Sequence, residues 1–229
     1  MYPEENELIP SFGKIIFSDN QDYFAEIGEI ALDEFLDELP RLCEIPVIKS
    51  LQTCLQITQS IRERNAVEQF LYFLRGYCTG TISPADLQSH RDKLQKNPKQ
   101  ARRELGRVLT ILDRSVEAQH SLCVGRFYAS FISGSFTWAD FCELTQANEK
   151  MFLNDYPLLH RIAQEINISG APNELYRAER LCSLGLVRHA SRLGQMTVAE
   201  LAGDSPEIVD FEITHFGKLF CKYDGFIPS

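Results

Sequence analysis

The sequence lacks an apolar run long enough to cross a membrane. Its best candidate, residues 45–61, is interrupted by Lys49, Gln52, Gln56 and Gln59, whereas a membrane-spanning helix needs about 18 nearly uninterrupted apolar residues. The acidic N-terminus also lacks the basic start and apolar core of a secretory signal. We therefore expect a cytoplasmic protein that makes no membrane contact.

The sequence also lacks any pair of cysteines with C-x-x-C spacing. A disulfide framework or a cysteine-based zinc motif would need closely spaced cysteines, so neither is expected. Most of the cysteines lie in apolar runs, which is typical of buried free thiols in a reducing compartment. The seven cysteines are Cys43, Cys54, Cys78, Cys123, Cys142, Cys182 and Cys221.

The common nucleotide-binding and hydrolase motifs are absent as well. Two E-x-x-H spacings occur, Glu117–His120 and Glu212–His215, and helical di-iron proteins use this spacing on facing helices. The second pair spans a predicted strand and helix cap, which separates its side chains. We therefore predict no catalytic residue, metal or cofactor, and a metal-dependent enzyme using Glu117 and His120 is the most remote alternative.

The composition is that of an ordinary globular protein, but its charge is segmented. The chain has 229 residues, of which 44% are hydrophobic and 24% charged, and its formal net charge is -9. Residues 1–47 carry a net charge of -10, residues 48–115 carry +6, and residues 116–229 carry -5. A chain of this overall charge is not an obvious binder of nucleic acid.

The densest basic segment lies in residues 91–107 and contains no aromatic residue. Without aromatic side chains it is poorly suited to stacking on single-stranded nucleic acid. It can pair with the acidic residues 1–47 of the same chain, or it can bind the acidic surface of another protein or a phosphate backbone. We expect part of the segment to stay exposed and to recruit such a partner. The residues expected to do so are Lys93, Lys96, Lys99, Arg102 and Arg103.

Apolar residues recur at helical spacing through the first two thirds of the chain. They predict helices over residues 22–39, from residue 46 and over residues 65–79. Ser83-Pro84 and Asn97-Pro98 predict the starts of two more, because each pairs a capping side chain with a proline in the first helical turn. The fold class is therefore mainly α, with a multi-helix bundle over residues 1–156.

Two segments of this helical part are internally similar. Residues 73–87 align without a gap with residues 127–141. In each, we expect the glycine to end one helix in the left-handed conformation, the Ser or Thr to cap the next helix, and the Asp to complete a capping box. The matched pairs are Gly80 and Gly134, Ser83 and Thr137, and Asp86 and Asp140. The pattern implies two related helix–turn–helix units in one bundle.

On these turns the middle of the chain, residues 65–155, resembles bacterial TerB-like helical modules. These modules share the order glycine, small residue, Ile or Phe, Ser or Thr, two residues and an acid between helices. The paired acidic residues associated with metal binding in that family have no matching positions around Gly80 or Gly134. The resemblance therefore implies a helical fold and no metal site.

In the C-terminal part, residues 175–187 have the pattern of a helix end followed by Leu-Gly-Leu-Val, and residues 211–220 have that of a strand and a closing helix. The first segment resembles the end of the recognition helix, and the second the strand and helix after the wing, of a degenerate bacterial winged-helix domain. Here Gly185 is expected to end a helix, and Thr214 to cap the last one. A winged-helix-like α+β module is therefore predicted over residues 157–229.

A winged helix can bind DNA or act as a protein-binding module. The four arginines that could contact DNA are Arg177, Arg180, Arg188 and Arg192. They are interspersed with acidic residues such as Glu174 and Glu179, which weakens the attraction to phosphate on which DNA affinity depends. We therefore predict a non-enzymatic regulatory or scaffolding protein that acts mainly through protein–protein contacts. A DNA-binding regulator is the alternative, and self-association stays open.

Overall fold

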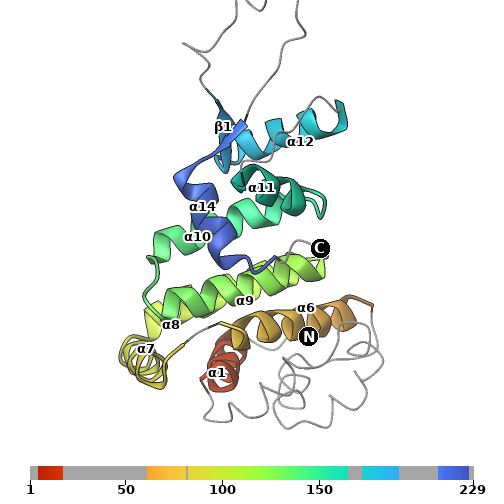
Figure 1. Ribbon diagram of the computed structural model, residues 1–229. Helices are drawn as coiled ribbons and strands as arrows, with labels where there is room; N and C mark the ends of the chain where they lie inside the picture. Colours follow the sequence, from red (N-terminus) through yellow and green to blue (C-terminus); the bar gives the residue numbers. More distant parts are fainter. Residues whose placement is uncertain (1–4, 18–60, 81, 165–171, 191–210, 227–229) are drawn as a thin grey trace, which may run out of the picture. The chain divides into compact units, whose positions relative to one another are not determined.

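The computed structural model describes residues 5–17, 61–80, 82–164, 172–190 and 211–226. These residues are mainly helical, with one small antiparallel sheet near the C-terminus (Figure 1). This confirms the predicted fold class, a helical bundle with a small α+β module. Within the described ranges, no helix combines the length and the apolar character that a membrane span requires.

The chain forms two compact units, residues 1–149 and residues 150–229. The helices of the first unit are α1 (Glu5–Ile16), α6 (Ile61–Cys78), α7 (Pro84–Lys96), α8 (Pro98–Arg114), α9 (Ala118–Ile132) and α10 (Trp138–Lys150). The second unit contains α11 (Asp155–Ala163), α12 (Pro172–Ser183), β1 (Val187–His189), β2 (Phe211–Ile213) and α14 (His215–Tyr223). The helices predicted over residues 22–39 and from residue 46 lie outside the described residues.

Helices α6 and α9 run side by side in the same direction and form the centre of the first unit (Figure 1). Near their starts, the Asn65 side-chain amide donates to the Ser115 carbonyl at 3.1 Å. One turn later, the Ser121 hydroxyl donates to Gln69 Oε1 at 2.7 Å. The residue numbers of the contacting partners increase together along both helices, so the two helices are parallel.

Two glycines allow the backbones of α6 and α9 to touch. A Cβ atom on Gly76 would lie 2.0 Å from the carbonyl oxygen of Leu122, and one on Gly125 would lie 2.1 Å from that of Phe73. No side chain fits at either distance, so any larger residue has to push the helices apart. The sequence therefore needs glycine at these two helical positions for packing, although glycine weakens a helix by itself.

The two matched glycines of the internal similarity, Gly80 and Gly134, have different structural roles. Gly134 has a φ of +75°, as predicted for a left-handed helix end. Gly80 does not adopt a positive φ, so the prediction for this residue is wrong. Its lack of a side chain instead allows close packing, because a Cβ atom there would lie 2.3 Å from the Cβ atom of Ala129.

Side-chain caps begin three of the helices, as the sequence predicts. Ser83, Asn97 and Thr137 each accept a hydrogen bond from the backbone N–H three residues later, at 3.1, 3.2 and 3.3 Å. Ser115, just before α9, does not cap that helix. Its hydroxyl donates back to the Ile111 carbonyl at 2.9 Å, so it satisfies the end of α8 instead.

The core of the first unit is aromatic. The ring of Tyr128, fully buried, lies 6.2 Å from that of Phe73 and 5.8 Å from that of Phe141. Trp138 is half-buried and stacks on Phe141 at 4.9 Å. Trp138 and Phe141 therefore belong to the aromatic core.

Helix α1 is not predicted from the sequence, because Pro10 lies inside it. A proline in a helix interior usually ends the helix, yet α1 continues to Ile16. Phe12, Ile15 and Ile16 are buried, and the ring of Phe12 lies 5.5 Å from that of Phe70 on α6. Burial of this apolar face offsets the cost of the proline.

The second unit begins earlier than the boundary predicted after residue 156. Asp155 starts α11, and its carboxylate binds Arg180 of α12, so this stretch belongs with the C-terminal elements. Strands β1 and β2 pair antiparallel, with Val187 opposite Ile213 and His189 opposite Phe211.

The ends of α12 and α14 have the predicted conformations. Gly185 has a φ of +74° after the last turn of α12. Thr214 caps α14 by accepting from the Gly217 N–H at 2.9 Å, and its hydroxyl donates to the Gly185 carbonyl at 2.7 Å. One threonine thus joins the end of α12 to the start of α14.

Candidate functional site

The predicted basic residues lie on the end of α7 and the first half of α8 and are all exposed. Their neighbour Arg107, two turns into α8, is exposed as well. We call this set the basic patch: Lys93, Lys96, Lys99, Arg102, Arg103 and Arg107. It is a continuous stretch of chain that turns at Asn97, whose side chain caps α8.

The single acidic residue within the basic patch faces inward. Between residues 93 and 107 the sequence contains only Glu104 as an acid, and this residue is 2% exposed. Its Oε1 atom accepts a hydrogen bond from the Tyr128 hydroxyl at 2.8 Å and lies 2.5 Å from His90 Nε2. Because its carboxylate is held inside, Glu104 does not neutralise the patch at the surface.

The Glu104 carboxylate, Tyr128 and His90 form a buried polar cluster between α7, α8 and α9. Burial, and then the charge and hydrogen bond of Glu104, raise the pKa of Tyr128 well above its usual value, so the phenol stays protonated and donates. The His90 ring meets Phe131 edge-on at 5.4 Å. With every member buried, this cluster fits a structural role.

The predicted DNA-contacting arginines are engaged within the second unit to different degrees. Arg180 donates to both carboxylate oxygens of Asp155, which is fully buried, at 2.8 and 2.5 Å. The hydrogen bond to Asp155 is also the main reason that the pKa of Arg180 is raised. The guanidinium group lies 4.5 Å from the ring centre of Phe152. Arg180 therefore holds α12 to the start of α11.

The other three arginines differ from Arg180. Arg188 is exposed on β1 and pairs with Glu212 of β2 at 2.7 Å. Arg177 is half-exposed and lies 5.7 Å from the ring centre of Tyr176. Arg192 lies outside the described residues. The structure thus brings no group of unpaired arginines together on the described part of α12 and β1.

The two E-x-x-H pairs do not form ligand sets among the residues that the structure covers. Glu117 is exposed just before α9, while His120 is buried and its carbonyl accepts from the Asn148 amide at 3.0 Å. Glu212 is on β2, where it pairs with Arg188, whereas His215 begins α14. Neither pair belongs to a group of three or more metal-ligating side chains in the described ranges.

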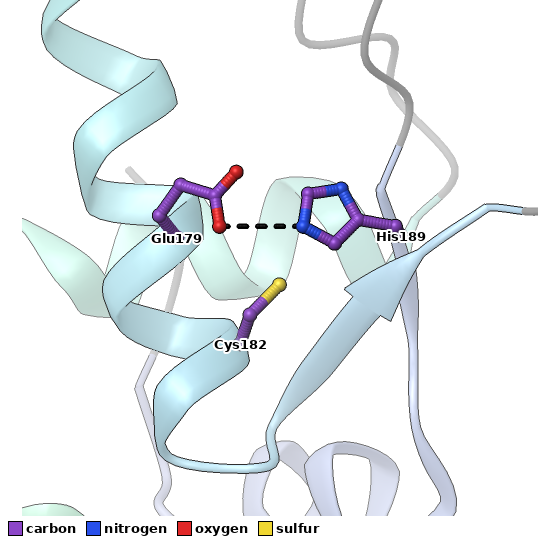
Figure 2. Close-up of side chains that lie close together, drawn as sticks. All are labelled: Glu179, Cys182 and His189. Carbon is purple, nitrogen blue, oxygen red and sulfur yellow. Dashed lines mark hydrogen bonds and ion pairs between the residues drawn. The ribbon is translucent and has the colours of Figure 1, made fainter.

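A different cluster does bring metal-ligating side chains together. Glu179 and Cys182 lie three residues apart on α12, and His189 is on the adjoining strand β1 (Figure 2). One ligand atom from each residue lies within 4.8 Å of the other two, and Glu179 Oε2 is 3.3 Å from His189 Nε2. Sequence reasoning missed this cluster, because its third member comes from the next element and no motif joins it to the first two.

Five of the cysteines lie in the described ranges, and all five are free thiols, as predicted. Only Cys123 is buried, whereas the other four are half-buried. Burial raises the pKa of Cys78 and Cys221 to about 12. Burial, and then the charge of Glu179, raises the pKa of Cys182 to about 11. These three thiols are therefore protonated near neutral pH and react slowly with electrophiles.

Comparisons with known proteins add no relative. No protein-family model matches the chain, and no curated protein or solved structure is significantly similar to it. Any functional conclusion therefore rests on this chain's own residues.

Proposed function

We propose that this protein is a non-enzymatic regulatory or scaffolding protein of the cytoplasm and that it binds the acidic surface of another protein through the basic patch. One observation carries this proposal. The only carboxylate between Lys93 and Arg107 is buried, and the six basic side chains of the same stretch are exposed. A surface of one sign attracts a partner of the other sign.

The arrangement suits a protein contact that is fast and sensitive to salt. Charges at the rim of an interface act mainly on the association rate, and at physiological ionic strength the Debye length is about 8 Å. The bases are spread over the last turn of α7 and the first three turns of α8. An acidic helix or loop can therefore contact several of them at once.

A charge-reversal variant tests the proposal. We expect Lys96→Glu/Lys99→Glu/Arg103→Glu to lose the partner that the wild-type protein captures from its native lysate, with an association rate reduced at least tenfold once that partner is purified. The matched control reverses three exposed lysines outside the basic patch, Lys150, Lys218 and Lys222, and should retain the partner. An unchanged association rate in the first variant, with its helical circular dichroism intact, contradicts the proposal.

A measurement of duplex DNA affinity on the same purified protein distinguishes protein binding from DNA binding. Duplex DNA affinity in the submicromolar range, with a steep salt dependence, would instead support the winged-helix-like alternative. In that case Arg177→Gln and Arg188→Gln should abolish binding. Those two arginines are the appropriate targets, because Arg180 is held by the buried carboxylate of Asp155, whereas the partner of Arg188, Glu212, is not buried.

A further inference from the structure

The cluster of Glu179, Cys182 and His189 has the donor set of a transition-metal site. Carboxylate, thiolate and imidazole are the three side-chain groups that bind Zn²⁺ in proteins. Thiolate and imidazole together select against Mg²⁺ and Ca²⁺, which prefer oxygen ligands. Within the described residues, no other group of three or more such side chains comes together.

The backbone fixes how these side chains meet. Residues three apart on a helix share a face, so Glu179 and Cys182 point to the same side of α12. The chain then turns through Gly185 in the left-handed conformation and returns as β1 alongside α12. This turn brings His189 back over the last turns of the helix, and its ring packs on Phe211 of β2 with centroids 5.0 Å apart.

The spacing of the donors agrees with a tetrahedral ion. Two oxygen or nitrogen ligands at about 2.0–2.2 Å from Zn²⁺ lie about 3.3–3.6 Å apart, and Glu179 Oε2 is 3.3 Å from His189 Nε2. The sulfur atom of Cys182 points into the space between the carboxylate and the imidazole (Figure 2). It lies within 4.8 Å of a ligand atom of each of these two residues.

The surroundings of the cluster do not oppose a cation. Arg188, the nearest base in sequence to His189, is paired with Glu212, and alternation along β1 directs it to the other face of the strand. Arg180, next to Glu179, is bound to Asp155. The positive charges next to the cluster along the chain are therefore already neutralised elsewhere.

We propose that Glu179, Cys182 and His189 bind one Zn²⁺ ion that joins the end of α12 to β1. The Cys182 thiol releases its proton to solvent as its sulfur binds the ion, and three protein ligands leave a fourth position for water or another donor. Glu179 and His189 are exposed, so the ion reaches the site from solvent. The site is independent of the basic patch, which lies in the other unit.

Substitution with Co²⁺ tests the site directly. Co²⁺ takes the place of Zn²⁺, and its bond to a thiolate gives a charge-transfer absorption that carboxylate and imidazole alone do not give. We expect the tag-free, reduced protein to bind one equivalent of Co²⁺ with this absorption, and Zn²⁺ to displace it. Cys182→Ser should abolish the absorption, and Glu179→Gln and His189→Ala should each weaken binding at least tenfold.

Matched controls keep the proposal open to refutation. Cys142→Ser removes another half-buried thiol and His215→Ala another exposed histidine, and both variants should bind Co²⁺ as the wild type does. Unchanged absorption in Cys182→Ser, or no thiolate absorption in the wild-type protein, overturns the proposal. Circular dichroism of each variant shows that any loss of binding occurs in a folded protein.

Discussion

The two units solve the problem of buried polar groups differently. In the first unit a buried carboxylate, Glu104, receives a hydrogen bond from a neutral phenol and sits against His90 inside an aromatic core. In the second unit a buried carboxylate, Asp155, is held by the guanidinium group of Arg180. A second fully buried carboxylate there, Asp224, lies 2.8 Å from His160 Nε2.

The two units also differ in size, residues 1–149 against residues 150–229. A small unit buries a smaller share of its apolar surface than a large one does, so the second unit depends more on each pair of polar contacts. The first unit instead depends on close helix packing around α6 and α9. Disrupting packing should therefore affect the first unit most, and removing one partner of a buried pair should affect the second.

The largest effect is expected from a side chain between α6 and α9. Gly125→Ala places a methyl group 2.1 Å from the Phe73 carbonyl oxygen, and the helices have to separate, at a cost of more than about 3 kcal/mol. Urea unfolding followed by the fluorescence of Trp138, the single tryptophan of the chain, measures this unit. The control is Gly106→Ala on α8, where the new atom meets Ile9 at 3.5 Å. That change should stabilise the helix by up to about 1 kcal/mol.

The next largest effect is expected in the second unit. Arg180→Met leaves the fully buried carboxylate of Asp155 without its cation, and breaking such a pair costs about 3–5 kcal/mol. Since a quarter of the Arg180 side chain is exposed, at 24%, we expect about 2–3 kcal/mol. Circular dichroism should show an early transition that Trp138 fluorescence does not follow. Arg177→Met, at a half-exposed arginine, should change stability by less than about 0.5 kcal/mol, and equal losses for both would refute the structural role of Arg180.

A smaller effect is expected from the buried cluster around Glu104. Tyr128→Phe removes a hydrogen bond to a carboxylate, which costs about 1.5–3 kcal/mol, and His90 remains to hold Glu104. We therefore expect a loss near 1.5 kcal/mol in urea unfolding. Tyr77→Phe is the matched control, since its hydroxyl is 3.5 Å from the Ile16 carbonyl oxygen and makes a weak contact. If the two variants are equally stable, the hydrogen bond to Glu104 contributes nothing.

The smallest effect is expected at a helix cap. Thr137→Ala removes the oxygen that accepts from the Asp140 N–H and donates to its carboxylate, and loss of a cap costs about 1 kcal/mol. Thr137→Ser keeps the hydroxyl and should be as stable as the wild type. Thermal unfolding compares the three proteins, and equal melting temperatures for Ala and Ser would rule out a contribution from the cap.

Local features of the fold could be read from the sequence, whereas contacts between distant residues could not. The caps at Ser83, Asn97 and Thr137 and the turn at Gly185 depend on neighbouring residues only, and the structure has them. Helix α1 could not be predicted, because the apolar contacts that offset Pro10 come from α6 and α8. The same limit explains Gly80, because the residue that leaves no room for a side chain there, Ala129, belongs to α9.

The candidate sites divide in the same way. The basic patch could be predicted, because its residues lie close together along the chain and the sequence shows their charge. The inward direction of Glu104 could not, since it depends on Tyr128 and His90. The partners of Arg180 and His189 also come from other elements, so the sequence could indicate neither the ion pair with Asp155 nor the cluster with Glu179.

The parallel pairing of α6 and α9 bears on how fast the first unit folds. Antiparallel helices joined by a short loop can pair as soon as both exist, but two parallel helices need a returning connection. Here that connection is residues 79–117, which contain α7 and α8. The loop-closure entropy of this connection has to be overcome before the contacts at Gly76 and Gly125 form, and non-local pairing slows folding. This unit should therefore fold more slowly than an up-and-down bundle of the same length, and a chain shortened before α9 leaves the closest packing surface of α6 without its partner.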